Sequence, residues 1–244
     1  MSRFKILVLD NFDEVFFKEL KEYGQIIKAD SIEGLETELV DVEILVVRSN
    51  TKVDVNLVDR MPKLRVVITA THGEDHIDRE CLRKRKISYY NAPVQTMYVA
   101  QGAIAAILAL HTRLVEGDAS MKRGMWRKKD LIGYSIFGKA LGIIGYGRIG
   151  REVARLALAL GMKVCVYDPY VQNIDSNVVF LRLDELLRQS DVVSVHTPLT
   201  DDTRNLIGKK EIDMMKDGAF LINISRGGIV DEKALLEALK SGKL

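Results

Sequence analysis

The sequence predicts an α/β protein made of two doubly wound parallel-sheet domains. Short runs of β-branched and aliphatic residues alternate with helical patterns through most of the 244 residues. The alternation pauses between residues 91 and 138, so it forms two separate series. A chain of this length suits two modest domains better than one. Strands that alternate with helices form parallel sheets with crossover helices on both faces.

The first series predicts a domain over residues 1–92. Its apolar runs are expected to form strands at 4–10, 25–29, 43–49, 64–70 and 87–91. Amphipathic patterns between them predict helices at 12–22, 31–40, 54–60 and 78–85. Pro93 disfavours helix at the residue before it, which marks the boundary. A second domain is therefore expected over 93–244.

The segment that opens the second domain predicts a subunit interface. Residues 97–116 form a long helical pattern that is apolar on too many sides for a lone surface helix. Residues 117–138 contain four glycines and are expected to be an irregular arm that carries Trp126, the single tryptophan. Apolar surface of this kind marks contacts between subunits, so we expect a homodimer through 97–138.

The second series follows this arm. Its strands are expected at 139–145, 163–168, 178–181, 192–197 and 219–225, with helices in the gaps. These five strands are expected to form the second parallel sheet.

Composition argues against several classes of function. The 36 basic and 34 acidic side chains nearly cancel, so neither nucleic acid nor a membrane surface is an expected partner. The most apolar helical stretch, 99–110, is well short of the roughly 20 residues that span a bilayer. Cys81 and Cys165 are isolated, which is typical of a reduced cytoplasmic protein, and Cys165 is expected in the core. No metal site is assigned.

A glycine-rich loop gives the clearest functional signal. Gly145, Gly147 and Gly150 form G-x-G-x-x-G between an apolar strand and a helix rich in alanine and leucine. The first glycine permits a tight turn, the second lets a pyrophosphate approach the backbone, and the third lets helix and strand pack closely. The helix start offers N–H groups to the phosphates. The expected phosphate-binding residues are Gly145, Tyr146, Gly147, Arg148, Ile149 and Gly150.

An acidic residue after the next strand indicates which dinucleotide binds. Asp168 lies 18 positions after Gly150, close to the expected separation of about 20. Its carboxylate can bind the adenosine ribose hydroxyls and would repel a 2′-phosphate. Pro169 and Tyr170 supply no cation for such a phosphate. The sequence therefore predicts NAD rather than NADP.

Four stretches together resemble one known family. They are "VVRSNTKVD" (46–54), "LGIIGYGRIG" (141–150), "HTPLTDDTRNLI" (196–207) and "NISRGGIVDEKALLEALKSGKL" (223–244). The chain resembles the D-isomer-specific 2-hydroxyacid dehydrogenases, most closely the D-3-phosphoglycerate dehydrogenase branch. The resemblance implies a flavodoxin-like substrate domain, a Rossmann NAD-binding domain, and a cleft between them. It also implies hydride transfer between NAD and a small D-2-hydroxy acid such as 3-phosphoglycerate or glycerate.

The resemblance also assigns roles to individual residues. Arg226 would be the catalytic arginine, and its planar guanidinium suits a substrate carboxylate. Arg48 and Ser49 match the substrate loop, as does Gly73, whose neighbouring amides would hold the carboxylate. Thr197 and Pro198 would shape the loop beneath the adenosine. These last two positions therefore join the cofactor-binding set.

The pattern departs from the family in three places: the substrate loop, the turn "NAPVQTMYVAQ" (91–101) and the end of the chain. The family's "GxGxDNID" is "THGEDHID" here, with Thr71 for a glycine and His76 for the asparagine; Gln101 replaces a glutamate. The family continues beyond position 244 with segments that carry the catalytic glutamate and histidine, so we expect an incomplete chain. His72 and His76 are the candidate substitutes for that base.

Two classes of function remain open. The first is an NAD-dependent D-2-hydroxyacid dehydrogenase. The second is an NAD-binding protein without turnover, either a corepressor-like sensor or an inactive fragment. Relatives of both classes share the motif around Arg226, so that motif does not discriminate between them.

Overall fold

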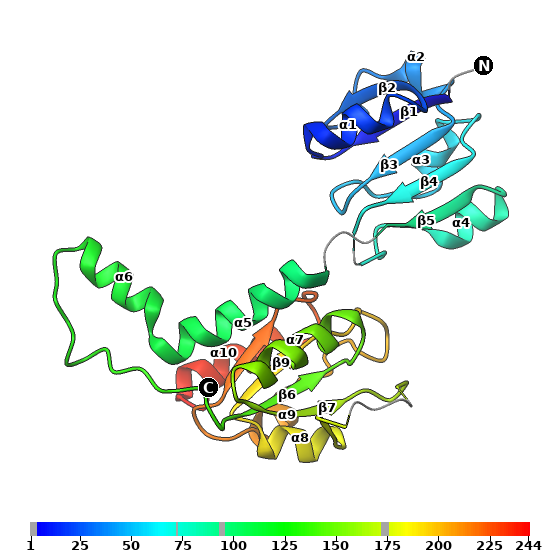
Figure 1. Cartoon of the computed structure of the whole chain (residues 1–244). Coiled ribbons are helices and arrows are strands. Elements are labelled where there is room, and N and C mark those ends of the chain that lie inside the picture. The colour runs from blue at the N-terminus through cyan, green and yellow to red at the C-terminus, as the bar shows by residue number, and fades with distance from the viewer. Residues whose placement is uncertain (1–3, 72, 93–95, 172–175) are drawn as a thin grey trace. The chain divides into compact units, whose positions relative to one another are not determined.

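The computed structural model describes residues 4–71, 73–92, 96–171 and 176–244 (Figure 1). The chain divides into two compact units, Met1–Val94 and Gln95–Leu244. Each unit contains one five-stranded sheet in which all strand pairs are parallel. The predicted fold class, two parallel-sheet α/β domains, is confirmed.

The sheet of the first unit has the strand order β2-β1-β3-β4-β5. The order reverses between β1 and β3, so loops after these two strands diverge at the carboxyl edge, where ligands of open α/β sheets bind. The strands are β1 (Phe4–Leu9), β2 (Gly24–Ala29), β3 (Ile44–Val47), β4 (Val66–Thr69) and β5 (Ser88–Asn91).

Helices cover both faces of this sheet. One face packs against α1 (Glu14–Leu20), which contributes Phe16 and Phe17 to a cluster with Ile6 and Val8 of β1. The other face packs against a larger core that includes Leu45, Leu57 and Leu82. The helices that bear on it are α2 (Glu36–Leu39), α3 (Val55–Asp59) and α4 (Arg79–Lys84).

The sheet of the second unit has the strand order β8-β7-β6-β9-β10. Numbered within this unit it is 3-2-1-4-5, which follows the first five places of the dinucleotide-binding order. The reversal lies between β6 and β9, which pair from Leu141 with Val192 to Ile144 with Val195. The strands are β6 (Ala140–Ile144), β7 (Lys163–Tyr167), β8 (Val179–Phe180), β9 (Val192–Val195) and β10 (Phe220–Asn223).

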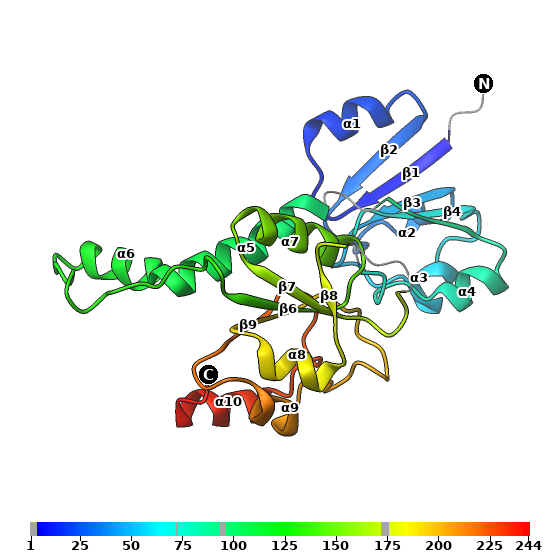
Figure 2. The same cartoon turned by 60° about the horizontal axis from the view of Figure 1, so that its bottom comes forward.

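Helices again lie on both faces of this sheet, as Figure 2 shows. On one face, α5 and α7 share a core with the strands that includes Ile107, Val153 and Ile143. On the other face the core includes Leu186, Ile212 and Ala238. The helices are α5 (Thr96–Thr112), α7 (Arg148–Ala159), α8 (Leu183–Gln189), α9 (Lys209–Met214) and α10 (Glu232–Ser241).

The long helix predicted over 97–116 is wrong at its C-terminal end. Helix α5 ends at Thr112, Arg113 adopts a left-handed conformation with φ of 53°, and a separate helix, α6 (Leu114–Lys122), follows. The expected irregular arm of 117–138 therefore begins later than predicted. Arg113 bonds the Glu116 carboxylate and donates to the Asp130 carbonyl at 2.8 Å. These contacts hold the break in place and tie the arm to it.

Helices α5 and α6 are bent by 67° at this break. Within the described residues, no single helix has the length and apolarity needed to cross a membrane. The two helices satisfy those criteria only when counted together.

Candidate functional site

The glycine-rich loop packs tightly against the end of β9. Gly145 follows β6 with φ of +93°, a conformation that side chains rarely allow. A Cβ added there would lie 2.9 Å from the carbonyl carbon and oxygen of His196. The His196 amide donates to the Ile144 carbonyl at 2.7 Å. The loops after β6 and β9 thus meet at the point where the strand order reverses.

The other two glycines have different surroundings. A Cβ on Gly150 would lie 2.1 Å from the Gly145 carbonyl oxygen, so this glycine lets α7 pack on the loop. A Cβ on Gly147 would meet nothing within 4 Å, and Gly147 is exposed at the start of α7. The first amides of a helix lack partners within it and point toward such open space. The loop therefore presents an accessible backbone that fits a pyrophosphate.

Asp168 connects the loop to the end of β7. One carboxylate oxygen accepts from the Tyr146 amide at 2.8 Å, and the other accepts from the Tyr170 amide at 2.9 Å. A carboxylate offers about four acceptor positions, so two remain for hydroxyl groups. Tyr146 itself is buried, packs edge-on against Phe180 and carries the Arg151 guanidinium over its ring. The chemistry of this donor and acceptor set fits the diphosphate and ribose of NAD.

Thr197 and His196 lie beneath this loop. The Thr197 hydroxyl oxygen is buried without a hydrogen-bond partner, and its methyl carbon would contact a Cβ at Gly145. His196 Nε2 lies 2.8 Å from the fully buried Ser194 hydroxyl. Burial lowers the pKa of His196 to about 4, so the ring is neutral at neutral pH. Pro198 is exposed, and its carbonyl accepts from the Thr203 hydroxyl at 2.6 Å.

Arg226 follows β10 at the same carboxyl edge. Its Nη1 donates to the Ser225 carbonyl at 2.9 Å, and the Asn223 amide group donates to the Arg226 carbonyl at 2.8 Å. Asn223 thereby holds the turn that carries Arg226. The side chain is partly buried, so its charge is fixed near the edge of the second sheet.

The first unit gathers a second polar group at its own strand-order reversal. Asp10, directly after β1, is buried and has φ of 72°. Its carboxylate accepts from the Arg48 amide at 2.6 Å, and Arg48 Nη1 donates to the Asn11 carbonyl at 3.1 Å. Arg48 and Ser49 are exposed directly after β3. The loops after β1 and β3 are therefore joined by charged hydrogen bonds.

The predicted substrate loop follows β4, the next strand in this sheet. Gly73 is partly buried, and its carbonyl accepts from the Thr71 hydroxyl at 2.7 Å. His76 lies farther along the same loop, with Nε2 3.0 Å from the Thr69 hydroxyl. The other candidate base, His72, lies outside the described residues.

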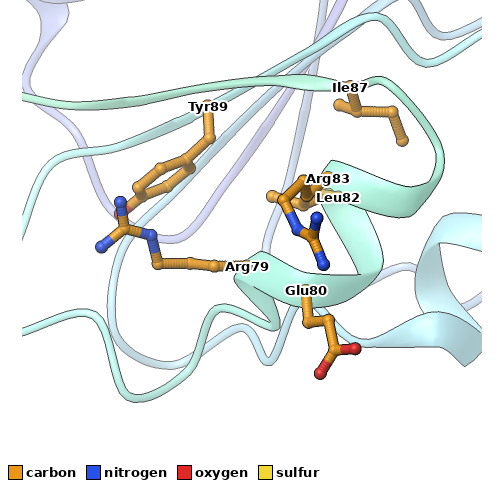
Figure 3. A pocket seen from close by; sticks show the side chains of 6 residues that line it. All are labelled: Arg79, Glu80, Leu82, Arg83, Ile87 and Tyr89. Carbon is orange, nitrogen blue, oxygen red and sulfur yellow. The ribbon is translucent and has the colours of Figure 1, made fainter.

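A surface hollow of about 490 Å³ lies beside α4 and β5, and its lining includes Arg79, Leu82 and Tyr89 (Figure 3). Glu74 of the loop binds Arg79 at 3.1 Å and also accepts from the Asn91 amide group. The Arg79 guanidinium lies over the Tyr89 ring, 5.4 Å from its centroid. Burial, with a further contribution from the Glu74 charge, raises the pKa of Tyr89 to about 12. The Tyr89 hydroxyl is thus a neutral group beside the loop.

Comparison with known proteins assigns this arrangement to a family. A family model described as "D-isomer specific 2-hydroxyacid dehydrogenase, NAD binding domain" matches residues 104–244. The hydroxypyruvate reductase of Thermotoga maritima is 37% identical, over all of this chain and 81% of its own length. The chain belongs to the D-isomer-specific 2-hydroxyacid dehydrogenase family. The predicted family and the predicted cofactor, NAD, are both confirmed.

Other relatives set the extent of the likeness. The D-3-phosphoglycerate dehydrogenase of Methanocaldococcus jannaschii is 39% identical over 98% of this chain. The chain spans 47% of that relative, about half its length. The crystal structure of D-lactate dehydrogenase from Aquifex aeolicus, complexed with NAD and lactic acid, has a TM-score of 0.87 and 34% identity. That likeness covers 98% of this chain and 74% of the other.

Sequence reasoning missed two groups of the site. Asp10 ends the run "FKILVLD" and was predicted only as part of a strand. The sequence did offer a signal for Asp10: an acidic residue directly follows β1, one of the two strands between which the strand order reverses. Ser194, the buried partner of His196, lies inside a strand, and no pattern in the sequence marks its contact.

We predict that Gly147→Ala and Gly150→Ala will affect different properties. The first leaves the fold unstrained but puts a methyl group where the pyrophosphate must approach, so NAD affinity should fall about tenfold or more while stability stays within about 0.5 kcal/mol. The second forces a methyl group against the Gly145 carbonyl and should destabilise the unit by about 1–3 kcal/mol. Calorimetric NAD titration and urea unfolding of both variants would measure this. Unchanged NAD affinity in Gly147→Ala would contradict the assignment of the loop.

Proposed function

We propose that this chain serves an NAD-dependent oxidoreductase that transfers a hydride between NAD and a small D-2-hydroxy acid. The observation that carries the proposal is the phosphate loop on α7 together with Arg226, both at the carboxyl edge of one sheet. Relatives named for reactions on hydroxypyruvate, 3-phosphoglycerate and glyoxylate support this substrate class. The buried thiols of Cys81 and Cys165, whose pKa values are raised by burial, suit a reducing cytoplasm.

In this proposal, different residues of the second unit bind different parts of the cofactor. Gly145, Tyr146, Gly147, Arg148, Ile149 and Gly150 hold the pyrophosphate through their backbone, and Arg148 adds an exposed cation. Asp168 holds the adenosine ribose, and Thr197 and Pro198 form the surface beside it. The Thr197 hydroxyl, buried without a partner, is a ready hydrogen-bonding group for the nucleotide.

The substrate is proposed to bind through charge and backbone donors. Arg226 orients the carboxylate and the reacting oxygen with its planar guanidinium. In the first unit, the amides beside Gly73, with Arg48 and Ser49, are the groups proposed to bind a carboxylate. NAD, when bound, accepts or supplies the hydride. These groups of the chain thus orient the substrate and stabilise the charge on its oxygen.

Proton transfer needs a base, and two described histidines are unsuited to it. His111 is buried on α5, where Nδ1 donates to the Ile107 carbonyl at 2.9 Å and the ring packs on Phe220. His196 is bound to Ser194 and has a pKa lowered to about 4. A base with so low a pKa binds the substrate proton weakly at neutral pH.

This engagement of His111 and His196 favours a second candidate function, NAD binding without turnover by these 244 residues. In that case the chain would act as a cofactor-dependent sensor or as a binding fragment. The phosphate loop and Asp168 serve that function equally well. Turnover, rather than NAD affinity, therefore discriminates between the two candidates.

The deciding experiment follows NADH oxidation with glyoxylate, hydroxypyruvate and pyruvate. We expect at least one acid to be reduced, and Arg226→Gln to lower kcat/KM about a hundredfold without changing NAD affinity. Arg182→Gln, on an exposed arginine before α8, is the matched control and should have no effect. Tight NAD binding with no acid-dependent oxidation in the unaltered chain would refute the dehydrogenase and support the sensor.

We also propose that the chain forms a homodimer through residues 97–138. Helix α6 and the segment that follows extend away from the second sheet in both views (Figures 1 and 2). Arg113 and the Tyr134 amide, which donates to the His111 carbonyl at 2.8 Å, hold this extension in place. The exposed apolar side chains of residues 97–138 are Tyr98 and Leu110 on α5 and, beyond it, Leu114, Val115, Met121, Met125, Trp126, Ile132, Tyr134 and Phe137. A partner subunit that covers them would bury a large apolar surface.

Light scattering at micromolar concentration tests the dimer. We expect a mass of about 55 kDa, twice the chain mass of 27.5 kDa. Val115→Glu should give monomers because it places a charge where an apolar partner surface must pack. Leu236→Glu changes an exposed leucine on α10 and should leave the dimer intact. A monomeric mass for the unaltered chain would contradict the proposal.

A further inference from the structure

The two substitutions in the predicted substrate loop, Thr71 and His76, belong to one hydrogen-bond chain. The Thr69 hydroxyl oxygen lies 3.0 Å from the Thr71 hydroxyl oxygen and 3.0 Å from His76 Nε2. The Thr71 hydroxyl donates to the Gly73 carbonyl at 2.7 Å. Thr69 is fully buried at the end of β4, so water does not compete for its hydroxyl. These four residues connect the last residue of the strand to the loop.

The direction of every hydrogen bond in this chain follows from the chemistry of its groups. A carbonyl oxygen only accepts, so the single hydroxyl proton of Thr71 points to Gly73. The Thr71 oxygen must then accept the single hydroxyl proton of Thr69. The Thr69 oxygen, its proton committed, must in turn accept from His76, whose Nε2 therefore carries hydrogen. The order is fixed from the imidazole to the Gly73 carbonyl.

We infer that His76 is a positioning residue that acts through Thr69 and Thr71 to fix the peptide of Gly73. The role toward substrate rests on the proposed function, in which amides beside Gly73 hold the substrate carboxylate. Family members have glycine and asparagine at positions 71 and 76, so this hydroxyl-and-imidazole chain differs from their pattern. It gives the loop a side-chain support at the place where the family has a glycine.

The supports at the ends of the loop show what this chain adds. The Ala70 amide donates to the Val47 carbonyl at 3.1 Å, and the Val53 amide donates to the His76 carbonyl at 2.8 Å. Glu74 binds Arg79 and Asn91. The chain through Thr71 adds a restraint on Thr71 and Gly73. Backbone donors bind an anion well only when their orientation is fixed in advance.

The direction of these hydrogen bonds also limits what His76 can do in proton transfer. Its Nε2 already carries a proton and donates it to Thr69, so this nitrogen cannot receive the substrate's proton while the chain is intact. His76 therefore orients the loop from Nε2, and its substitution should change how the acid is held.

The tautomer provides a test that needs no substrate. Long-range ¹H–¹⁵N spectra of the ¹⁵N-histidine chain at about pH 8 identify which ring nitrogen carries hydrogen in neutral imidazole. We expect His76 in the Nε2–H form, and the same signal in Thr69→Ser, which keeps the hydroxyl. An Nδ1–H tautomer would overturn the inference.

Matched variants then test positioning. His76→Leu and Thr69→Val break the chain, whereas His76→Gln keeps an N–H and Thr69→Ser keeps a hydroxyl. We expect the Gly73 amide signal to move in the first pair and to stay near its original position in the second. With NADH bound, the affinity for hydroxypyruvate should fall about three- to tenfold in the first pair, with NAD affinity unchanged in all four.

The two readouts separate this inference from the proposed function. If the Gly73 signal does not move in His76→Leu, the positioning role is wrong. If the signal moves and is restored as expected, but the unaltered chain binds neither hydroxypyruvate nor glyoxylate, positioning stands and the proposed substrate class fails. Equal losses of hydroxypyruvate affinity in His76→Gln and His76→Leu would also contradict the positioning role, because the N–H retained by glutamine should restore the loop.

Discussion

The close approach of Gly145 to the backbone of His196 is the contact on which the carboxyl edge of the second sheet depends. Strands β6 and β9 are parallel neighbours, so their two loops begin side by side at the same edge of the sheet. The loops then lead to opposite sides of this pair, toward β7 and β10. The hydrogen bond from the His196 amide to Ile144 brings the two loops together. A side chain at Gly145 would overlap the His196 carbonyl. With glycine there, the start of α7, Thr197 and Asp168 can all face one site.

The first unit solves the same geometric problem with a charged residue. At the reversal between β1 and β3, Asp10 adopts the left-handed conformation that glycine adopts at Gly145. Its carboxylate compensates by accepting from the Arg48 amide of the neighbouring loop. An aspartate tolerates this conformation better than most side chains, and here its bond reaches the neighbouring loop. The two strand-order reversals therefore differ. The one in the second unit has an open backbone that suits phosphate, and the one in the first unit has a carboxylate, Asp10, that holds a loop.

Much of this arrangement could be predicted from the sequence because it depends on local patterns. Buried parallel strands appear as continuous apolar runs, and those predicted ended within about two residues of the observed ones. The glycine motif and Asp168 occur at characteristic spacings, so the cofactor could be predicted too. The break at Arg113 could not, because a non-glycine residue is held in a left-handed conformation by distant partners such as Asp130. The chain from His76 to Gly73 was equally inaccessible, since it depends on side-chain directions across a turn.

The affinities of NAD and NADP for the unaltered chain and for Asp168→Ala test the central claim most directly. In this account the Asp168 carboxylate holds the ribose hydroxyls and repels a 2′-phosphate. Calorimetric titration should show tighter binding of NAD than of NADP by the unaltered chain. It should also show that Asp168→Ala weakens NAD about tenfold or more while NADP loses less or gains, because only NAD loses a hydrogen bond from a 2′-hydroxyl and only NADP is relieved of charge repulsion. Equal losses for the two cofactors, or no binding of either, would contradict the placement of NAD at this edge of the sheet.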